Sequence, residues 1–532
     1  MPWKERPKLA VLMALQMLWG LVLWFSISKY GLGVSTDAVH LLFGGLNLAS
    51  GNGLTSYDGK FLILWPPLYP VLLALVHRIG GLDVLTAAGL IQAVAFLGLA
   101  FSLAVLFVRI FNENFGLSIA ATLLAQVGSV VVIAFGMVGS DYVHLFLVVL
   151  LIVLTGHYVE SGSGGAFVAV AAVSLLATLQ RYLGVAAVAT AALTIAALGP
   201  GRLGRRLGNG ALLCGTTAPM GMWLAITSQL YTRRDPISLA ENFSWFSRSI
   251  LEWFLSPRSA KQGLELQIEI LWMVFVALAA TALVFARRPG RSTAPRTTHG
   301  QEGRSDPWPY LLPLLLYGLC YALAIFGSAS IAYFNKLGGR FLLPLYIPLI
   351  CLPVAAVDGI LRRVRGASSA VLQTLGAAAC YLALTSLAGA ALHTTYPMIL
   401  ESRASGTVGG ENAFNNIRWR QNPALGFWED HRPQGDYVLF SNEPDGVAFN
   451  TRHAARPAPR RTTGPYGTVE MPLGGFRSEL FESGEAVFLL WVEPNPYEYD
   501  YGPAELEAIA DVQALFTSDA GDVYQLRPQH GQ

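Results

Sequence analysis

The stretch STDAVHLLFGGLNLASGNGLTSYDGKFLILWPPLYP, residues 35–70, decides how the rest of the chain is read. It follows the first apolar run and contains Asp37, the first carboxylate after that run. Small residues predict a short helix over 41–50, and the glycines of Gly51-Asn52-Gly53 predict a turn after it. The prolines of Trp65-Pro66-Pro67 set the angle at which the chain begins the following helix. We therefore expect the remainder to be a scaffold that holds this stretch at a membrane surface.

The composition is typical of a multi-pass membrane protein. Of the 532 residues, 53% are hydrophobic and only 13% are charged, whereas soluble domains carry about 25% charged residues. The net charge of +2 offers no strong field for nucleic acid, so we expect no nucleic-acid partner. The four cysteines all fall inside apolar runs, without the spacing of a metal cluster or a disulfide framework.

Eleven apolar runs have about the length that crosses a bilayer as a helix. They cover residues 9–29, 83–108, 116–138, 141–159, 165–180, 183–199, 209–229, 266–286, 309–330, 341–361 and 369–393. No small-residue cleavage site follows the first run, so we interpret it as a retained span and not as a signal peptide. A shorter apolar run, 66–79, is expected to lie as a juxtamembrane helix at the outer surface.

The basic residues indicate the orientation of these spans. With eleven spans, every basic cluster lies on one side, which the positive-inside rule makes the cytoplasmic side. We therefore expect the protein to lie in the inner (plasma) membrane, with its N-terminus in the cytoplasm. The orientation depends on splitting the long run 165–199 at Gln180-Arg181-Tyr182. Leaving 165–199 whole while counting 66–79 as a span would also keep the later basic clusters inside, but it would move Asp141 to the cytoplasmic side.

The composition changes after the last span, where Asp, Glu, Arg, Asn and Pro become common. We therefore divide the chain into a membrane domain, 1–393, with a first outer loop at 30–82, and an extracytoplasmic domain, 394–532. The strands predicted in the second domain cover 436–442, 486–492, 512–517 and 522–526, and a short helix covers 503–509. The predicted fold class is a multi-pass α-helical membrane protein with a small C-terminal α/β domain.

Carboxylates at the outer ends of spans are the first candidates for chemistry. Asp37 follows the first span and Asp141 opens the fourth. Each carboxylate either takes part in a reaction or only caps or anchors its helix. His40 lies one helical turn after Asp37, on the same side of the helix. It either makes an ordinary polar contact or is a metal ligand beside Asp37.

Basic residues on the same face indicate an anionic ligand. Arg181 and Tyr182 interrupt a hydrophobic hairpin, and an arginine there needs an anionic partner. A lipid phosphate fits because a guanidinium matches phosphate oxygens in a two-pronged way. Lys336 and Arg340 form a second basic pair on an outer loop. For both pairs, the alternative is a headgroup anchor or a snorkelling side chain.

Taken in order, these segments resemble those of the lipid-linked-sugar glycosyltransferases of the GT-C class. The chain is most similar to bacterial members of the protein mannosyltransferase superfamily, which comprise glycosyltransferase family 39 and the related aminoarabinose transferase group. The match covers most of the chain. Its segments are Asp37 after the first span, Tyr57-Asp58-Gly59, WPPLYPVLLAL at 65–75, Ser140-Asp141, Arg181-Tyr182-Leu183-Gly184, the GRFLLPLY segment at 339–346, and Asn442-Glu443-Pro444-Asp445.

Four positions depart from the family pattern. Leu41 stands where the family usually has a tyrosine, and Gly44-Gly45 replaces an alanine pair. Asn335 stands where an acid is common before the last basic segment. These departures bear on the substrate and on the level of activity.

The resemblance implies an inverting transfer of a sugar from a polyprenyl-phosphate donor to an acceptor hydroxyl at the outer face. Asp37 would be the general base, within about 3 Å of the acceptor proton, and Asp141 would support it or share a divalent cation with it. Arg181 and Arg340 would bind the phosphate and stabilise its charge as it leaves. Metal dependence differs among such enzymes, so no metal ligand is assigned. The other substrate-binding candidates are His40, Tyr57, Trp65, Tyr182 and Lys336, and the acceptor is a glycan, a lipid or a protein.

Two other functions stay open at this point. A catalytically inactive GT-C scaffold would bind the lipid carrier without transfer, and the departures at Leu41 and Asn335 agree with it. A lipid-linked glycan transporter or flippase would carry charges near the bilayer midplane and inverted internal repeats. The notable charges here lie at span ends and the two halves are unalike, so the sequence favours the glycosyltransferase.

Overall fold

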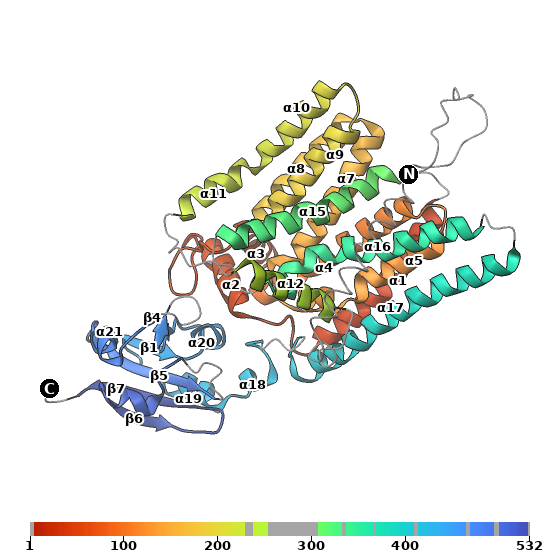
Figure 1. The fold of residues 1–532 in the computed structure, drawn as a ribbon. Helices are drawn as coiled ribbons and strands as arrows, with labels where there is room; N and C mark the ends of the chain where they lie inside the picture. Colours follow the sequence, from red (N-terminus) through yellow and green to blue (C-terminus); the bar gives the residue numbers. More distant parts are fainter. Residues whose placement is uncertain are drawn as a thin grey trace.

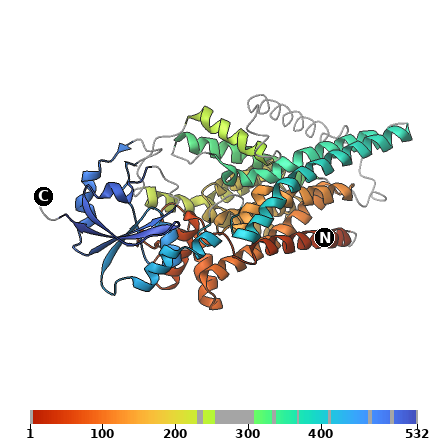
Figure 2. The ribbon, with the colours of Figure 1, turned by 90° about the horizontal axis from the view of Figure 1, so that it is seen from below.

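The computed structural model describes residues 5–228, 238–253, 307–331, 337–365, 369–408, 413–463, 469–493 and 499–529. Helices make up the larger, N-terminal part, and a mixed sheet with short helices makes up the rest (Figure 1). Figure 2 shows the sheet domain at one end of an elongated helical bundle, and α1 begins towards the other end. This arrangement is the predicted fold class.

Seven described helical segments are long and apolar enough to cross a membrane, and a bent pair adds an eighth if it is counted as one span. In one of the seven, two helices follow each other through a short 3-10 turn. The segments are α1 (Arg6–Ile27), α4 (Val84–Ile110), α7 (Ser140–Ser161), α10 (Leu203–Cys214) with η2 (Gly215–Thr217) and α11 (Ala218–Ser228), α15 (Trp308–Ile331), α16 (Gly339–Arg365) and α17 (Ala370–Ser405).

The predicted spans agree with these helices. The span predicted at 266–286 lies outside the described residues. Every other predicted span falls on a described helix or on two consecutive helices. The spans predicted at 165–180 and 183–199 correspond to α8 (Gly164–Gln180) and α9 (Gly184–Leu198), which are apolar but only 17 and 15 residues long.

The break between α8 and α9 lies where the sequence placed it. Arg181 has an extended backbone (φ −150°, ψ 145°), so it ends α8. The chain then turns back so tightly that a Cβ added at Gly184 would lie 2.2 Å from the Ala177 carbonyl oxygen. Only glycine fits this close backbone approach. The Arg181-Tyr182 pair is therefore held in a compact turn between two helices.

The span predicted at 116–138 is not one continuous helix. It is divided into α5 (Phe115–Val127) and α6 (Ser129–Gly136), which meet at an angle of 54°. Gly128 between them has extended backbone angles (φ −64°, ψ 136°), which interrupt the helical hydrogen bonds. Counted as one span, the pair lies where the sequence predicted it, although an apolar run does not show where its helix bends.

The stretch 35–70 forms α2 (Thr36–Ala49) and the loop that leads to α3 (Leu68–Gly80). The two helices pack closely, because a Cβ at Gly45 would lie 2.7 Å from Cβ of Leu73. A Cβ at Gly44 would lie 2.2 Å from Cδ1 of Leu62. α3 and the loop therefore pack directly against the Gly44-Gly45 pair, which departs from the family pattern. The structure has α3 where the sequence predicted the juxtamembrane helix, 66–79.

The C-terminal sheet has the strand order β2-β1-β5-β7-β6. β1 runs parallel to β2 and β5, with Leu439 opposite Phe488, and β7 runs antiparallel to β5 and β6. Both central parallel strands are almost entirely buried, which is why they are continuous apolar runs. The strands are β1 (Tyr437–Ser441), β2 (Arg456–Pro457), β5 (Ala486–Val492), β6 (Ala510–Phe516) and β7 (Gly521–Pro528).

Smaller elements complete the second domain. A separate antiparallel pair is made by β3 (Thr462–Thr463) and β4 (Val469–Glu470). The helix predicted at 503–509 is shorter in the structure, since it ends at Leu506. The helices around the sheets are α18 (Ile417–Arg420), α19 (Pro423–His431), α20 (Pro444–Thr451), α21 (Phe476–Phe481) and α22 (Pro503–Leu506).

The last span extends past the predicted domain boundary at 393. The helix α17 continues to Ser405, so the sheet domain is built from residues after it. The polar residues that suggested an earlier end are accommodated within the helix. Thr394 donates a hydrogen bond to the Ala390 carbonyl at 3.2 Å, and Thr395 donates one to the Val127 carbonyl of α5 at 2.7 Å.

Candidate functional site

The helix α2 brings Asp37 to the end of the bundle that carries the sheet domain. Its N-cap is Ser35, whose side chain accepts a hydrogen bond from the Ala38 amide at 3.5 Å. A carboxylate in the first turn is also favoured by the helix dipole. The side chain of Asp37, however, pairs with Arg340 at the start of α16. Capping is thus supplied by Ser35 and does not account for Asp37.

Asp37, Asp141, Arg181 and Arg340 form one ion-pair network, which we name the charged cluster. Arg340 pairs with Asp37 through a terminal nitrogen, and its Nε lies 3.6 Å from Oδ2 of Asp141. Asp141 pairs in turn with Arg181. The residues come from the first turns of α2, α7 and α16 and from the turn between α8 and α9. Two carboxylates and two guanidiniums balance, so the cluster is neutral when all four are ionised.

The two halves of the charged cluster differ in exposure. The side chains of Asp141 and Arg181 are 13% and 14% exposed, whereas those of Asp37 and Arg340 are 34% and 41% exposed. A buried charge is stable only beside a close partner, so the Asp141–Arg181 pair is the fixed half. Asp37 and Arg340 are the half that a ligand can reach.

The ring of Phe341 lies beside both arginines of the charged cluster. Its centre is 5.8 Å from Cζ of Arg181 and 5.7 Å from Cζ of Arg340. An aromatic ring attracts a guanidinium electrostatically. The Phe341 carbonyl accepts a hydrogen bond from the Tyr321 hydroxyl at 2.6 Å, which ties α16 to α15. The ring thus helps to keep two like charges close together.

The turn between α8 and α9 is tied to the rest of the site by neutral hydrogen bonds. Gln180 is buried and donates to the Ser140 carbonyl at 3.1 Å, next to Asp141. The Tyr182 hydroxyl donates to the Ile63 carbonyl at 3.0 Å, in the loop that leads to α3. The indole of Trp223 donates to the same hydroxyl at 3.3 Å. Tyr182 therefore anchors the loop and does not belong to the charged cluster.

A second group, which we name the interdomain junction, joins this loop to the sheet domain. Nδ1 of His40 lies 2.5 Å from Oγ of Ser56, and Nε2 lies 3.3 Å from Oδ1 of Asp445 in α20. The Tyr57 hydroxyl donates to the same Asp445 oxygen at 2.8 Å. The imidazole is stacked between two rings, at 5.4 Å from Tyr57 and 5.0 Å from Trp65. The Asp445 carboxylate of the sheet domain thus contacts two candidate residues, His40 and Tyr57, and the third candidate, Trp65, stacks on His40.

Protonation at the interdomain junction follows from burial. Burial, and then the nearby Asp445 carboxylate, raise the pKa of the Tyr57 phenol well above its ordinary value. Tyr57 is therefore protonated and acts as a donor at any physiological pH. Burial, and then the charge of Asp445, raise the pKa of Glu443 to about 7. Glu443 is therefore a group beside the junction that titrates near neutral pH.

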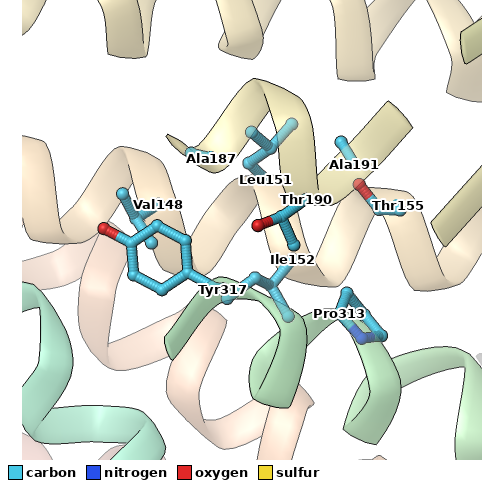
Figure 3. Close-up of a pocket in the computed structure, with 9 residues that line it drawn as sticks. All are labelled: Val148, Leu151, Ile152, Thr155, Ala187, Thr190, Ala191, Pro313 and Tyr317. Atoms are coloured by element: carbon cyan, nitrogen blue, oxygen red, sulfur yellow. The ribbon is translucent and has the colours of Figure 1, made fainter. Parts of the chain in front are cut away.

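A small cavity lies deeper in the bundle, between α7, α9 and α15 (Figure 3). Its first lining residue on α7, Val148, is two helical turns beyond Asp141. The lining is mostly apolar, and no residue of the charged cluster belongs to it. The lining residues are Val148, Leu151, Ile152, Thr155, Ala187, Thr190, Ala191, Pro313 and Tyr317.

Solved structures resemble the whole chain, although no family model and no curated protein sequence matches it. ArnT from Cupriavidus metallidurans, in a crystal structure bound to undecaprenyl phosphate, is 13% identical with a TM-score of 0.57, and the match covers 97% of each chain. An oligosaccharyltransferase from Archaeoglobus fulgidus, in complex with Zn and sulfate, is 12% identical with a TM-score of 0.53, over 96% of this chain and 72% of that one. The mycobacterial arabinofuranosyltransferase AftD is 15% identical with a TM-score of 0.50, over 98% of this chain and 42% of that one.

The fold is GT-C-like. The similarity extends over the sheet domain as well as the bundle, since it covers nearly all of the chain. At these low identities the likeness concerns the backbone arrangement. The chemistry of this GT-C-like chain therefore has to be argued from its own side chains.

Most residues proposed from the sequence meet in this GT-C-like fold, in two groups. Asp37, Asp141, Arg181 and Arg340 make the charged cluster. His40, Tyr57 and Trp65 lie together at the interdomain junction, and Tyr182 lies beside the loop between them. Lys336 and Asn335 lie outside the described residues. Leu41, the departure next to His40, is buried in the core.

The structure adds two residues that were not among the proposed site residues. Asp445 follows the carboxyl end of strand β1, and the sequence noted it only as part of a matching segment. Side chains at the carboxyl ends of parallel strands commonly lie at functional edges of α/β sheets, which is a signal that could have drawn attention to it. Asn415 contacts the connection before α2, as described below. No sequence signal marks Asn415.

Among the described residues, no group of three or more His, Cys, Asp or Glu side chains converges to hold a metal ion. The charged cluster supplies two carboxylates, Asp37 and Asp141, and Arg340 lies against both of them. A cation shared by these carboxylates would have to displace Arg340. The donor set of the cluster therefore does not fit a resident metal.

Proposed function

We propose that this protein transfers a sugar from a polyprenyl-phosphate donor to an acceptor hydroxyl at the membrane surface. The observation that carries the proposal is the charged cluster, which joins two arginines to two carboxylates at the ends of membrane helices. The overall fold supports it, since a protein of similar fold was solved bound to undecaprenyl phosphate. The arginines suit a phosphate, and a carboxylate suits the hydroxyl that attacks.

In the proposed reaction, Asp37 is the general base. It takes the proton of the acceptor hydroxyl as the hydroxyl oxygen attacks C1 of the donor sugar. The new C–O bond forms as the bond from C1 to the phosphate oxygen breaks, and the electron pair leaves with the phosphate. Attack from the side opposite the leaving group inverts the configuration at C1. Asp37 suits this role because it belongs to the exposed half of the cluster.

The two arginines take the leaving phosphate in this scheme. Arg340 is the exposed guanidinium and meets the phosphate first, and Arg181 is fixed behind it by Asp141. Positive charge placed where negative charge develops lowers the barrier of the transfer. Asp141 contacts both guanidiniums, so we assign it to holding them and thereby to supporting the base. No step requires a divalent cation, and we expect a metal chelator to leave the transfer rate unchanged.

The remaining candidates line the approach to this chemistry. We propose that His40, Tyr57 and Trp65 form the wall on the side of the sheet domain. Tyr182 would form the wall at the loop that leads to α3. Lys336 is assigned to phosphate binding from the sequence resemblance alone. The acceptor is a glycan, a lipid or a protein, and the proposed location is the inner membrane, with the sheet domain outside.

The deciding experiment measures transfer of radiolabelled sugar from polyprenyl-phosphate donors in membranes that contain wild type or Asp37→Asn. The amide keeps the size of the side chain and loses its capacity to take the proton. We expect transfer by wild type and at least a hundredfold loss in Asp37→Asn. The matched control is Asp58→Asn, which removes one carboxylate from the loop that leads to α3. Asp58 pairs there with Lys60 at 3.0 Å.

Each other outcome selects a different function. Equal transfer by wild type and Asp37→Asn would contradict the role of Asp37. Binding of polyprenyl phosphate without transfer from any donor would favour the inactive scaffold. Movement of the lipid-linked glycan across a vesicle membrane, without a change of its bond to phosphate, would favour the transporter.

A further inference from the structure

The connection that leads into α2 bonds to the segment between α6 and α7 through Gly33, and to the C-terminal part of the chain chiefly through Asn415. The Asn415 amide nitrogen donates to the carbonyls of Tyr30 and Leu32, both at 2.8 Å. Its carbonyl oxygen accepts from the Val34 amide at 3.1 Å. The side chain is buried, and the bonds satisfy both of its donors and its acceptor. The neighbouring Phe414 amide donates to the Val34 carbonyl at 2.8 Å.

These bonds fix the backbone immediately before the helix of Asp37. Val34 precedes the N-cap Ser35, and Asp37 lies in the first turn of α2. The Tyr30 carbonyl also accepts a hydrogen bond from Arg420 at 2.8 Å, but a shift of the Asn415 amide would leave the Leu32 carbonyl and the Val34 amide without this partner. The start of α2 is therefore held by residues that belong to the sheet domain's side of the chain.

The interdomain junction contacts the same helix, α2, along its length. His40 lies one turn after Asp37 on α2, and Asp445 of α20 reaches both His40 and Tyr57. Arg452, at the end of α20, lies 5.8 Å from the ring of Phe43 on α2. Two separate contacts with the C-terminal part of the chain, one at the start of α2 and one along its side, thus fix a helix of only 14 residues.

We propose that Asp445 and Asn415 are positioning residues, through which the sheet domain sets the place of Asp37 relative to Arg340 and Arg181. Asp445 acts through His40 and Tyr57, and Asn415 acts through the backbone at 30–34. This inference rests on the proposed function for its consequence in catalysis. The structural half, that the sheet domain holds α2, does not depend on that function.

The first test follows the mobility of α2 without any activity. Hydrogen–deuterium exchange is measured on the purified full-length chain, as wild type and Asp445→Ala. We expect the amides of Thr36–Ala49 to exchange at least tenfold faster in Asp445→Ala, while those of Val84–Ile110 in α4 keep their wild-type rates. Asp436→Ala is the matched control, since Asp436 is an exposed carboxylate just before β1. Unchanged exchange in α2 would overturn the proposal.

The second test separates positioning from binding. A base displaced by about 1 Å costs on the order of a hundredfold in rate, so we expect kcat of Asp445→Ala to fall tenfold to a hundredfold. The donor KM should stay within twofold, because Arg181 and Arg340 are untouched. The losses caused by Tyr57→Phe and Asp445→Ala should combine in the double variant to less than their product, since the phenol donates to Asp445. A raised KM with unchanged kcat would make Asp445 a substrate-binding residue and would contradict the proposal.

The two tests fail separately. Faster exchange of α2 in a chain that transfers no sugar would contradict the proposed function and leave the positioning role in place. A wild type that transfers sugar, with an Asp445→Ala variant that matches it in exchange and in kcat, would contradict only the positioning role. Asn415→Ala serves as the second variant, with the same expected rise in exchange beginning at the first turn of α2.

Discussion

Arg340 lies between two carboxylates, and this has a consequence for any phosphate that approaches it. Its terminal nitrogen is occupied by Asp37, and its Nε faces Asp141 at 3.6 Å. A donor phosphate that binds Arg340 therefore competes with the group that we propose as the base. Binding of the donor would release Asp37 from its partner and free it for the acceptor hydroxyl. In this scheme the donor binds first, and Asp37 becomes available as the base only afterwards.

This competition predicts that Asp37→Asn binds polyprenyl phosphate more tightly than wild type. Loss of the competing negative charge should lower Kd by about three- to tenfold, which corresponds to about 0.7–1.4 kcal/mol for a partly exposed pair. The measurement is titration of polyprenyl phosphate into the purified chain in nanodiscs. Asp58→Asn, which removes a carboxylate paired with Lys60 in the same loop, should keep the wild-type Kd. A Kd that is unchanged or higher in Asp37→Asn would show that the two anions do not compete.

Glu443 makes the stability of the sheet domain depend on pH, and the direction follows from its raised pKa. Burial, and then the charge of Asp445, raise its pKa from 4.5 to about 7. A carboxyl whose pKa is raised in the folded state stabilises the fold below its unfolded pKa. That contribution is lost as pH rises through about 7. Because the side chain is only half-buried, we expect the effect to be about 1–2 kcal/mol.

The corresponding variant is Glu443→Gln, which resembles the protonated acid. We expect its apparent Tm to exceed that of wild type at pH 8 and to equal it at pH 4.5, as measured by thermal unfolding of the full chain. Glu482→Gln, at an exposed glutamate after α21, should show no difference between the two pH values. An equal gain for Glu443→Gln at both pH values would contradict the assigned titration.

The sequence could identify all four residues of the charged cluster but not their pairing. Asp37, Asp141 and Arg181 were predicted from their places at span ends, where an ionisable group is uncommon in a membrane segment. The partner of Asp37 lies 303 residues away, and no local pattern connects the two. Asp445 was missed as a site residue for the same reason, since its contacts lie 388 residues away in the loop that contains Tyr57.

At the scale of elements, α2 and α3 approach each other closely at Gly45. Gly45 has no Cβ, and an added one would lie 2.7 Å from Cβ of Leu73 and 3.4 Å from the Pro70 carbonyl oxygen. The first distance is too short for any real pair of Cβ atoms. A methyl group here must therefore push α3 away from α2, and the loop that contains Trp65 would move with it.

We predict that Gly45→Ala lowers stability by about 1–3 kcal/mol, the usual cost of overpacking. The apparent Tm of the purified chain should fall accordingly. Gly89→Ala is the matched control, because it adds the same methyl group to a helix at a place with no heavy atom within 4 Å. It should leave the Tm unchanged or raise it slightly. A Tm loss of the same size in both variants would contradict the close contact of α2 and α3.

The elements also show what a hydropathy pattern can and cannot predict. The split between α8 and α9 was predictable because Gln180-Arg181-Tyr182 places polar groups inside an apolar run. The bend between α5 and α6 was not predicted, because Gln126 and Ser129 beside Gly128 are single polar residues in an otherwise apolar run. Glycine occurs in straight membrane helices as well as at bends, so its presence alone decides nothing.

At the scale of the molecule, the two ends of the bundle carry different charge arrangements. The charged cluster lies at the end that holds the sheet domain. At the start of α1, Glu5 pairs with Arg109 at 3.8 Å, and Arg109 also lies 3.7 Å from Glu160. Arg362, near the end of α16, pairs with Glu113 at 3.1 Å. These basic residues belong to the end that the positive-inside rule assigns to the cytoplasm.

This assignment predicts which sites a membrane-impermeant maleimide can reach. In a background without the four native cysteines, Asp519→Cys in the sheet domain should be labelled in intact cells. Arg205→Cys, in the basic segment of α10, should be labelled only after the membrane is permeabilised. Both residues are exposed, so accessibility is decided by the membrane and not by burial. The reverse labelling pattern would contradict the proposed orientation.

The overall architecture was predictable because both of its signals are compositional. Long apolar runs predicted the bundle, and the change to polar residues with two buried strands predicted the α/β domain. The place where one part ends was harder to predict, since α17 continues through polar residues to Ser405. The packing of the sheet domain against α2 could not be predicted, because it depends on contacts such as that of Asn415 with Tyr30, 385 residues apart.

The bonds of Asn415 also bear on how the protein is made. A ribosome completes α1, α2 and the described spans before it reaches residue 415, so the earlier helices wait in the membrane without this amide. During that interval the helix of Asp37 lacks both the bonds at 30–34 and the contact with Asp445. The proposed site is therefore completed only after the described membrane helices have been synthesised. We therefore expect a chain that stops before residue 415 to insert its helices but to lack the contacts that hold the helix of Asp37.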